Sequence, residues 1–136
     1  MKHLLLILSF LLLSPPLFGQ SFVSVGNSGT ILTSSDGISW TKRTSGKWGY
    51  LKGVTSGNGL FVTDGNSGTI LTSSDGNSWT KRTSGTSKYL RGVTSGTGLF
   101  VTVGESGTIL TSPDGNSWTK RTSGTSKYLR GVTYSQ

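Results

Sequence analysis

The sequence predicts an all-β protein built from propeller blades, and three observations support this prediction. A unit of 39 residues recurs over residues 22–60, 61–99 and 100–136. Within each unit, short runs rich in Val, Ile, Thr and Phe alternate with turns of Gly, Asn, Asp and Ser. No run outside the first residues has the apolar period of a capped helix. Four short antiparallel strands per repeat of about 40 residues are typical of a propeller blade. The alternative, a solenoid of stacked hairpins, requires polar caps that the sequence does not contain.

The three copies are close to identical, so each must form the same supersecondary unit. Residues 61–94 and 100–133 differ at only three positions. These are Asp64/Val103, Asn66/Glu105 and Ser74/Pro113. The first copy, residues 22–55, differs from the second at seven positions.

Four strands can be assigned in order from the alternation of apolar and turn residues. They are expected at residues 90–94, 99–103, 108–111 and 117–122. The segments Ser-Gly-Thr-Gly, Gly-Glu-Ser-Gly and Ser-Pro-Asp-Gly separate them, and their Gly, Asn or Asp residues supply the positive φ angles that tight hairpins need. The same pattern predicts four strands in each full copy.

The first nineteen residues have the three-part form of a secretory signal peptide. Lys2 and His3 precede an apolar run from Leu4 to Leu13, and a Ser-Pro-Pro break leads to a cleavage site before Gln20. The run is too short to span a bilayer comfortably, although an uncleaved anchor is the alternative. The chain has no cysteine, which excludes disulfides and attachment through a lipidated cysteine. We therefore expect residues 20–136 to be exported, to the periplasm or the exterior, and free of the membrane after cleavage.

A turn of sequence Ser-x-Asp-Gly-x-Ser-Trp occurs in each copy, at residues 34–40, 73–79 and 112–118. It resembles the Asp-box (BNR-like) motif of sialidase-type propellers, although it is one residue shorter and has Ser in place of Thr. Residues 22–136 are also similar to the GTILTSxDGxxW repeats of exported bacterial propellers and of photosystem II assembly factors. The resemblance implies a structural turn between the third and fourth strands of each blade. Its residues are Asp36, Gly37, Trp40, Asp75, Gly76, Trp79, Asp114, Gly115 and Trp118.

The sequence repeat does not start at the first strand of a blade. Residues 22–25 correspond to a second strand, whereas residues 129–133 repeat a first strand. Three blades are too few for a closed ring. We expect two chains to pair head to tail, each donating residues 128–134 to the other, and so to close a six-bladed ring. A nine-bladed trimer and an unstable product of a truncated repeat array are the alternatives.

The composition argues against catalysis. Without residues 1–19 the chain has no His, Cys or Met, and loss of Lys2 leaves twelve basic and five acidic residues, a net charge of 12 − 5 = +7. Zinc and copper sites need His or Cys, and a Ser-His-Asp triad needs His. Three acids belong to turns, which leaves Asp64 and Glu105. We therefore expect no enzyme activity, no cofactor and no metal.

Binding is the function that the sequence favours. In a propeller, the loops at residues 46–52, 86–91 and 125–130 are expected to share one face. They repeat Tyr beside Lys or Arg, a combination suited to a protein or to an anionic or neutral glycan. The expected face comprises Trp48, Tyr50, Lys52, Asp64, Lys88, Tyr89, Arg91, Glu105, Lys127, Tyr128 and Arg130.

Three functions remain open for this face. The first is an exported interaction or scaffold module, the second a lectin-like multivalent binder, and the third a truncated repeat-array fragment without a function of its own. A structural role is the alternative for these residues. The tyrosines would then pack between blades, the basic residues around them would be solvated, and no ligand would be needed. The Lys-Arg pairs of the fourth strands protect an edge. We expect no nucleic-acid partner, because export would separate the protein from nucleic acid and the sequence contains no recognition motif.

Overall fold

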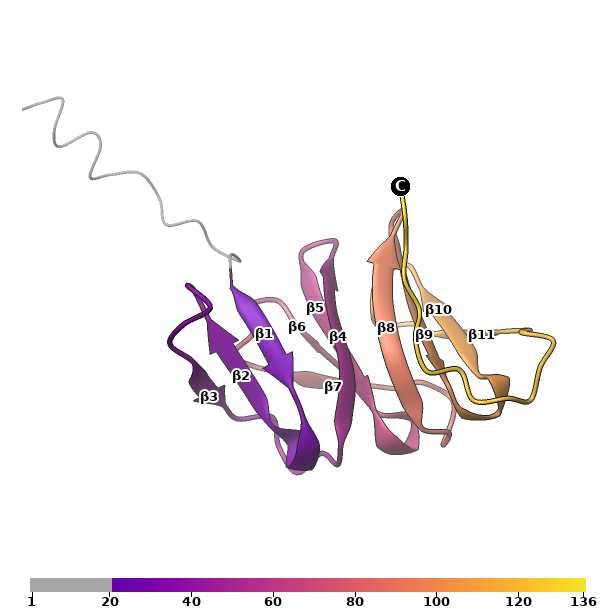
Figure 1. Cartoon of the computed structure of the whole chain (residues 1–136), viewed down its shortest axis with the longest axis horizontal. Coiled ribbons are helices and arrows are strands. Elements are labelled where there is room, and N and C mark those ends of the chain that lie inside the picture. The colour runs from indigo at the N-terminus through magenta and orange to yellow at the C-terminus, as the bar shows by residue number, and fades with distance from the viewer. Residues whose placement is uncertain (1–20) are drawn as a thin grey trace, which may run out of the picture.

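The computed structural model describes residues 21–136 and contains three antiparallel sheets that stand side by side as a fan (Figure 1). Each sheet is one blade. Blade 1 contains β1 (Phe22–Val25), β2 (Ile31–Ser34) and β3 (Thr41–Arg43). Blade 2 contains β4 (Leu51–Gly57), β5 (Leu60–Gly65), β6 (Ile70–Ser73) and β7 (Thr80–Arg82). Blade 3 contains β8 (Leu90–Gly96), β9 (Leu99–Gly104), β10 (Ile109–Ser112) and β11 (Thr119–Arg121). The predicted all-β blade architecture is confirmed, whereas the predicted signal peptide lies outside the described residues.

Each blade is a meander whose neighbouring strands are joined by tight turns. The β4–β5 hairpin turns at Asn58 and Gly59, which both have positive φ, 51° and 74°. Thr97 and Gly98 form the same turn between β8 and β9. This is the two-residue hairpin whose twist matches that of the strands it joins.

The second and third strands of each blade are joined by a short 3₁₀ turn that the sequence analysis did not predict. These turns are η1 (Asn27–Gly29), η2 (Asn66–Gly68) and η3 (Glu105–Gly107). The fourth strands are also shorter than expected, because β11 begins at Thr119, after the tryptophan of the preceding turn. No helix within residues 21–136 is long and apolar enough to cross a membrane.

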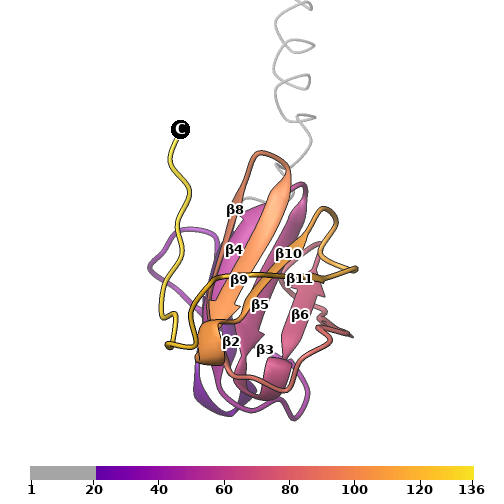
Figure 2. The ribbon, with the colours of Figure 1, turned by 90° about the vertical axis from the view of Figure 1, so that its right-hand side faces the viewer.

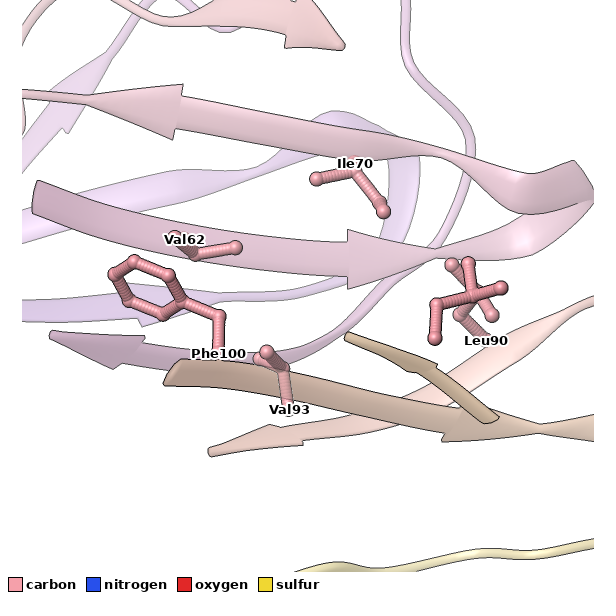
Figure 3. Close-up of a cluster of buried hydrophobic side chains, with 6 residues drawn as sticks. Val62, Ile70, Leu90, Val93 and Phe100 are labelled. Atoms are coloured by element: carbon pink, nitrogen blue, oxygen red, sulfur yellow. The ribbon is translucent and has the colours of Figure 1, made fainter. Parts of the chain in front are cut away.

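The hydrophobic core consists of two clusters, and each lies between neighbouring blades. Figure 3 shows the cluster between blades 2 and 3, in which Val62 and Ile70 face Leu90, Val93 and Phe100. The second cluster joins blades 1 and 2 and contains Ile31, Leu51 and Leu71. Alternation along each strand sends one set of apolar side chains into these clusters.

The first strands of successive blades approach very closely at glycines. A methyl group on Gly53 of β4 would lie 2.9 Å from the backbone nitrogen of Val93 and 3.1 Å from the Cα atom of Gly92, both in β8. Figure 2 looks along this stack, with β8 in front of β4. Only a residue without a side chain allows this contact.

The Ser-x-Asp-Gly turn is held by hydrogen bonds to its own backbone. In blade 2, Oδ1 of Asp75 accepts bonds from the amides of Asn77 and Ser78, at 2.8 and 3.1 Å. The indole N–H of Trp79 donates to the carbonyl of Gly76 at 2.9 Å. The amides of Ser78 and Asn77 hold the pKa of Asp75 below its ordinary value, since they favour the ionised carboxyl.

The turns of blades 2 and 3 also contact the blade before them, which sequence reasoning missed. The Cα of Gly76 faces the side chains of Val23 and Thr33 in blade 1, and Trp79 packs against the cluster between blades 1 and 2. Trp118 packs in the same way against the cluster between blades 2 and 3. The turns therefore join blades as well as strands.

We predict that Gly53→Ala destabilises the protein by about 1–3 kcal/mol, because the added methyl overpacks the backbone contact between β4 and β8. Urea unfolding followed by tryptophan fluorescence measures this. Ser56→Ala, at an exposed position of the same strand, is the control and should change stability by less than about 0.5 kcal/mol. Equal effects of the two substitutions would contradict a close approach at Gly53.

Candidate binding face

Two kinds of loop meet along the lower edge of the fan in Figure 1: the turns that follow β1, β5 and β9, and the ends of the loops that precede β4 and β8. Backbone hydrogen bonds hold them together. The amide of Asn66 donates to the carbonyl of Tyr50, and the amide of Glu105 donates to that of Tyr89, both at 2.9 Å. A second kind of contact joins successive blades: the amide of Leu51 donates to the carbonyl of Gly26 at 3.1 Å, and the amide of Leu129 donates to that of Gly104 at 3.0 Å. The loops predicted to share one face therefore do so.

Three tyrosines stand on this face, one at the start of each successive first-strand segment. Tyr50 is 47% exposed, Tyr89 is 40% exposed and Tyr128 is 54% exposed. Basic groups accompany two of them: the Nζ of Lys52 lies 5.3 Å from the ring centre of Tyr50, and the guanidinium of Arg91 lies 5.8 Å from that of Tyr128. These distances are within the range of cation–π attraction.

Arg91 also forms an ion pair with Glu105, so it is fixed between an aromatic ring and a carboxylate. Both side chains are partly buried, with 25% and 19% of their area exposed. In the preceding blade, Lys52 is equivalent to Arg91 and Asn66 is equivalent to Glu105. The position that carries the acid in blade 3 is therefore a neutral amide in blade 2. Neighbouring sites on the face thus share a tyrosine and differ in charge.

The remaining basic residues of the predicted face are accessible. Lys88 precedes Tyr89, Lys127 precedes Tyr128, and Arg130 lies two residues further on; all three side chains are exposed. Together with Lys52 and Arg91 they make the face strongly cationic.

Asp64 does not belong to the binding face, and its assignment there was wrong. Its side chain is fully buried between blades 2 and 3. One carboxyl oxygen accepts the amide of Gly53 at 2.9 Å, and the other accepts the hydroxyl of Thr102. Burial raises the pKa of Asp64 to about 6, and these hydrogen bonds only partly offset that effect. The equivalent residues Val25 and Val103 were the signal that this position faces the core.

Trp48 also differs from the prediction, since it is half-buried. It packs against the cluster between blades 1 and 2, and the Nζ of Lys81 in blade 2 lies 5.1 Å from its ring. The second copy has Ser87 at this position. Trp48 therefore covers the junction of the first two blades, and little of its ring is available to a ligand.

Two open hollows flank the face, of about 570 and 590 Å³. Each is lined by a 3₁₀ turn, a fourth strand and the loop that follows it, including Lys81 and Arg82 in one and Lys120 and Arg121 in the other. The arginines are held by their strands: Nε of Arg82 donates to the Thr72 hydroxyl at 2.9 Å. The sequence analysis assigned these pairs to edge protection and did not predict the hollows.

In the part of the chain that the structure describes, no three Asp, Glu or His side chains gather closely enough to hold a metal ion. The three turn aspartates are committed to backbone amides, and Asp64 is enclosed. The accessible chemistry of the face is therefore aromatic and cationic.

No family model matches the chain, and no curated protein matches it. Among solved structures, it is similar to YCF48 bound to D1 peptide, with a TM-score of 0.63 and 21% sequence identity. YCF48 is a β-propeller. The match covers 74% of this chain and 36% of that one, so the chain spans about a third of the length of its structural neighbour. The similarity supports a propeller-like repeat fold.

We predict that Asp64 makes the protein less stable as the pH rises through about 6. Its carboxyl has a pKa of about 6 when folded and 3.8 as its ordinary value, so the folded state holds the proton more tightly. The protonated carboxyl contributes its full stabilisation at pH values below the ordinary pKa. This stabilisation is lost as the pH rises through the pKa of the folded state. Between about pH 5 and 7.5 the loss should be about 1–2 kcal/mol.

Urea unfolding of the wild type and Asp64→Asn at those two pH values tests this prediction. The amide cannot ionise, so the variant should lose most of the pH dependence. Asp75→Asn is the control, because the pKa of Asp75 is lowered and its carboxylate remains ionised throughout the window. An unchanged pH dependence in Asp64→Asn would show that another group is responsible.

Proposed function

We propose that this protein is an exported, non-catalytic binding module whose tyrosine-rich cationic face takes up an acidic segment of a partner protein. The observation that carries the proposal is the recurrence of an exposed tyrosine, Tyr50, Tyr89 and Tyr128, once per first-strand segment on one face. The fixed spacing of the blades suits an extended chain that crosses several of them.

The charges support an acidic occupant. Basic side chains stand beside each tyrosine, and on this face the carboxylate of Glu105 is already paired with Arg91. A cationic face attracts anionic segments and accelerates their encounter, while tyrosine contributes apolar contact and a hydroxyl. YCF48, the structural neighbour, was solved with a bound peptide, which supports a peptide as the occupant.

The other parts of the proposal rest on the sequence. Export rests on the signal-like residues 1–19, and the lack of catalysis rests on a mature chain without His or Cys. We include in the proposal that a second copy completes the ring, giving six blades and a face that continues around the rim. A lectin-like role would use the same tyrosines for stacking on sugars, so the test must separate peptide from glycan.

We predict that the protein binds a fluorescein-labelled peptide of alternating Asp and Leu and does not bind its Lys-Leu counterpart. Fluorescence anisotropy measures both. Tyr89→Ala combined with Tyr128→Ala should weaken binding of the Asp-Leu peptide at least about tenfold, which is about 1.4 kcal/mol. A soluble chitin oligosaccharide, tested by competition, should leave the anisotropy unchanged.

Two charge-matched variants locate the site. Lys88→Ala with Lys127→Ala removes two cations from the face, and Lys42→Ala with Lys120→Ala removes two from the exposed fourth strands. The first pair should weaken peptide binding more than the second at about 0.1 M salt, where distant charges are screened. Equal losses would indicate a general charge effect, and displacement by the oligosaccharide would favour the lectin-like role.

A further inference from the structure

Strand β1 has one unpaired edge within the described residues. In blades 2 and 3 the second strand is paired on both sides, β5 with β4 and β6, and β9 with β8 and β10. Strand β1 is paired with β2 alone. Its free edge exposes backbone N–H and C=O groups that can form hydrogen bonds with another strand.

Residues 128–134 lie beside β8 in the way that β8 lies beside β4, as the trace ending at the C-terminus in Figures 1 and 2 shows. The amide of Leu129 donates to the carbonyl of Gly104. A methyl group on Gly92 would lie 3.4 Å from the Cα atom of Gly131. This segment therefore occupies the place of a first strand in a fourth blade, although it is paired with no strand of the described chain.

The outer faces of blades 1 and 3 expose side chains that are covered elsewhere in the stack. On blade 1, Trp40 is 43% exposed, while its counterparts pack against a preceding blade. On blade 3, Leu99 is 38% exposed and Ile109 is half-buried, whereas the equivalent Ile70 of blade 2 is fully buried. The outer face of blade 1 has the Ser-x-Asp-Gly-x-Ser-Trp turn, and the outer face of blade 3 has the surface that such a turn covers.

The free segment and the free edge also match in sequence. Residues 129–133 read Leu-Arg-Gly-Val-Thr, identical to residues 90–94 of β8. Strand β8 pairs with β9, whose Phe-Val-Thr-Val-Gly at residues 100–104 differs from residues 22–26 only by Thr in place of Ser24. Strand β1 thus offers nearly the same edge that already accepts this sequence in blade 3.

We propose that two copies of this chain exchange residues 128–134, each segment becoming the missing first strand beside β1 of the other copy. The register of β8 on β9 places Leu129 opposite the partner's Gly26, and Val132 opposite the partner's Ser24. Within one chain, β1 and the C-terminal segment lie at opposite ends of the fan (Figure 1), so the exchange takes place between chains. The inference rests on the part of the proposed function in which a second copy completes the ring, and it does not depend on peptide binding.

The exchange also brings the two exposed faces together. The Trp40 turn of one copy meets blade 3 of the other, as Trp118 meets blade 2 within the chain. Two such junctions, related by a twofold axis, close a ring of six blades. Both free edges and both exposed apolar faces are then covered.

Disulfide trapping tests this arrangement, because the chain has no cysteine of its own. Ser24→Cys combined with Val132→Cys places opposed thiols on paired strands, within the reach of a disulfide. Oxidation of the purified protein should give a band at twice the chain mass on a non-reducing gel. Ser24→Cys with Thr133→Cys is the control, since a shift of one residue turns the second thiol to the other side of the sheet. That control should give much less of the covalent dimer.

Light scattering behind size exclusion gives the mass without cross-linking, and a dimer is expected. Gly131→Ala should shift the protein to monomer without loss of stability, because nothing in the chain lies within 4 Å of the added methyl and the partner's β4 would. A synthetic peptide of residues 127–136 should likewise dissociate the dimer, and a scrambled peptide should not. A monomeric wild type, a disulfide formed within one chain, or a ladder of longer multimers would each overturn the proposal.

Discussion

The close approach of the first strands at Gly53 and Gly92 is the constraint on which the rest of the structure depends. With hydrogen in place of a side chain, the backbones of β4 and β8 come into contact. This contact fixes the spacing of β4 and β8, and the aliphatic clusters fill the space between neighbouring blades. It also encloses Asp64, whose carboxyl accepts the amide of Gly53 in the same blade and the hydroxyl of Thr102 across the junction.

Because every blade packs on the one before it, the stack is stabilised by interactions between neighbours, as in other repeat proteins. The Ser-x-Asp-Gly-x-Ser-Trp turn gives this contact a direction, because its glycine and its indole pack against the preceding blade. A stack built in this way has two different outer faces. The outer face of blade 1 has a Ser-x-Asp-Gly turn that contacts no other blade of the described chain. The outer face of blade 3 has a surface that no such turn covers. The two outer faces of the chain are therefore complementary to each other.

The sequence predicts the strands well, since alternation and turn residues are local signals. It also predicts that the Tyr loops share a face, because blade topology places them there. It did not predict the positions of Asp64 and Trp48, which depend on contacts between blades. Asp64 was assigned to the face because only one copy of the repeat has an acid at this position. The valines at the equivalent positions of the other copies indicated burial. The contact of Gly76 with blade 1 has no local signal at all.

The surface charge of the face follows from the way the acids are used. The chain has five acidic residues. Three accept amide hydrogen bonds within their own turns, Asp64 is enclosed between blades, and Glu105 is paired with Arg91. None is left to balance the lysines beside the tyrosines. The acidic partner that we propose for this face would supply that negative charge, at sites set by the spacing of the blades.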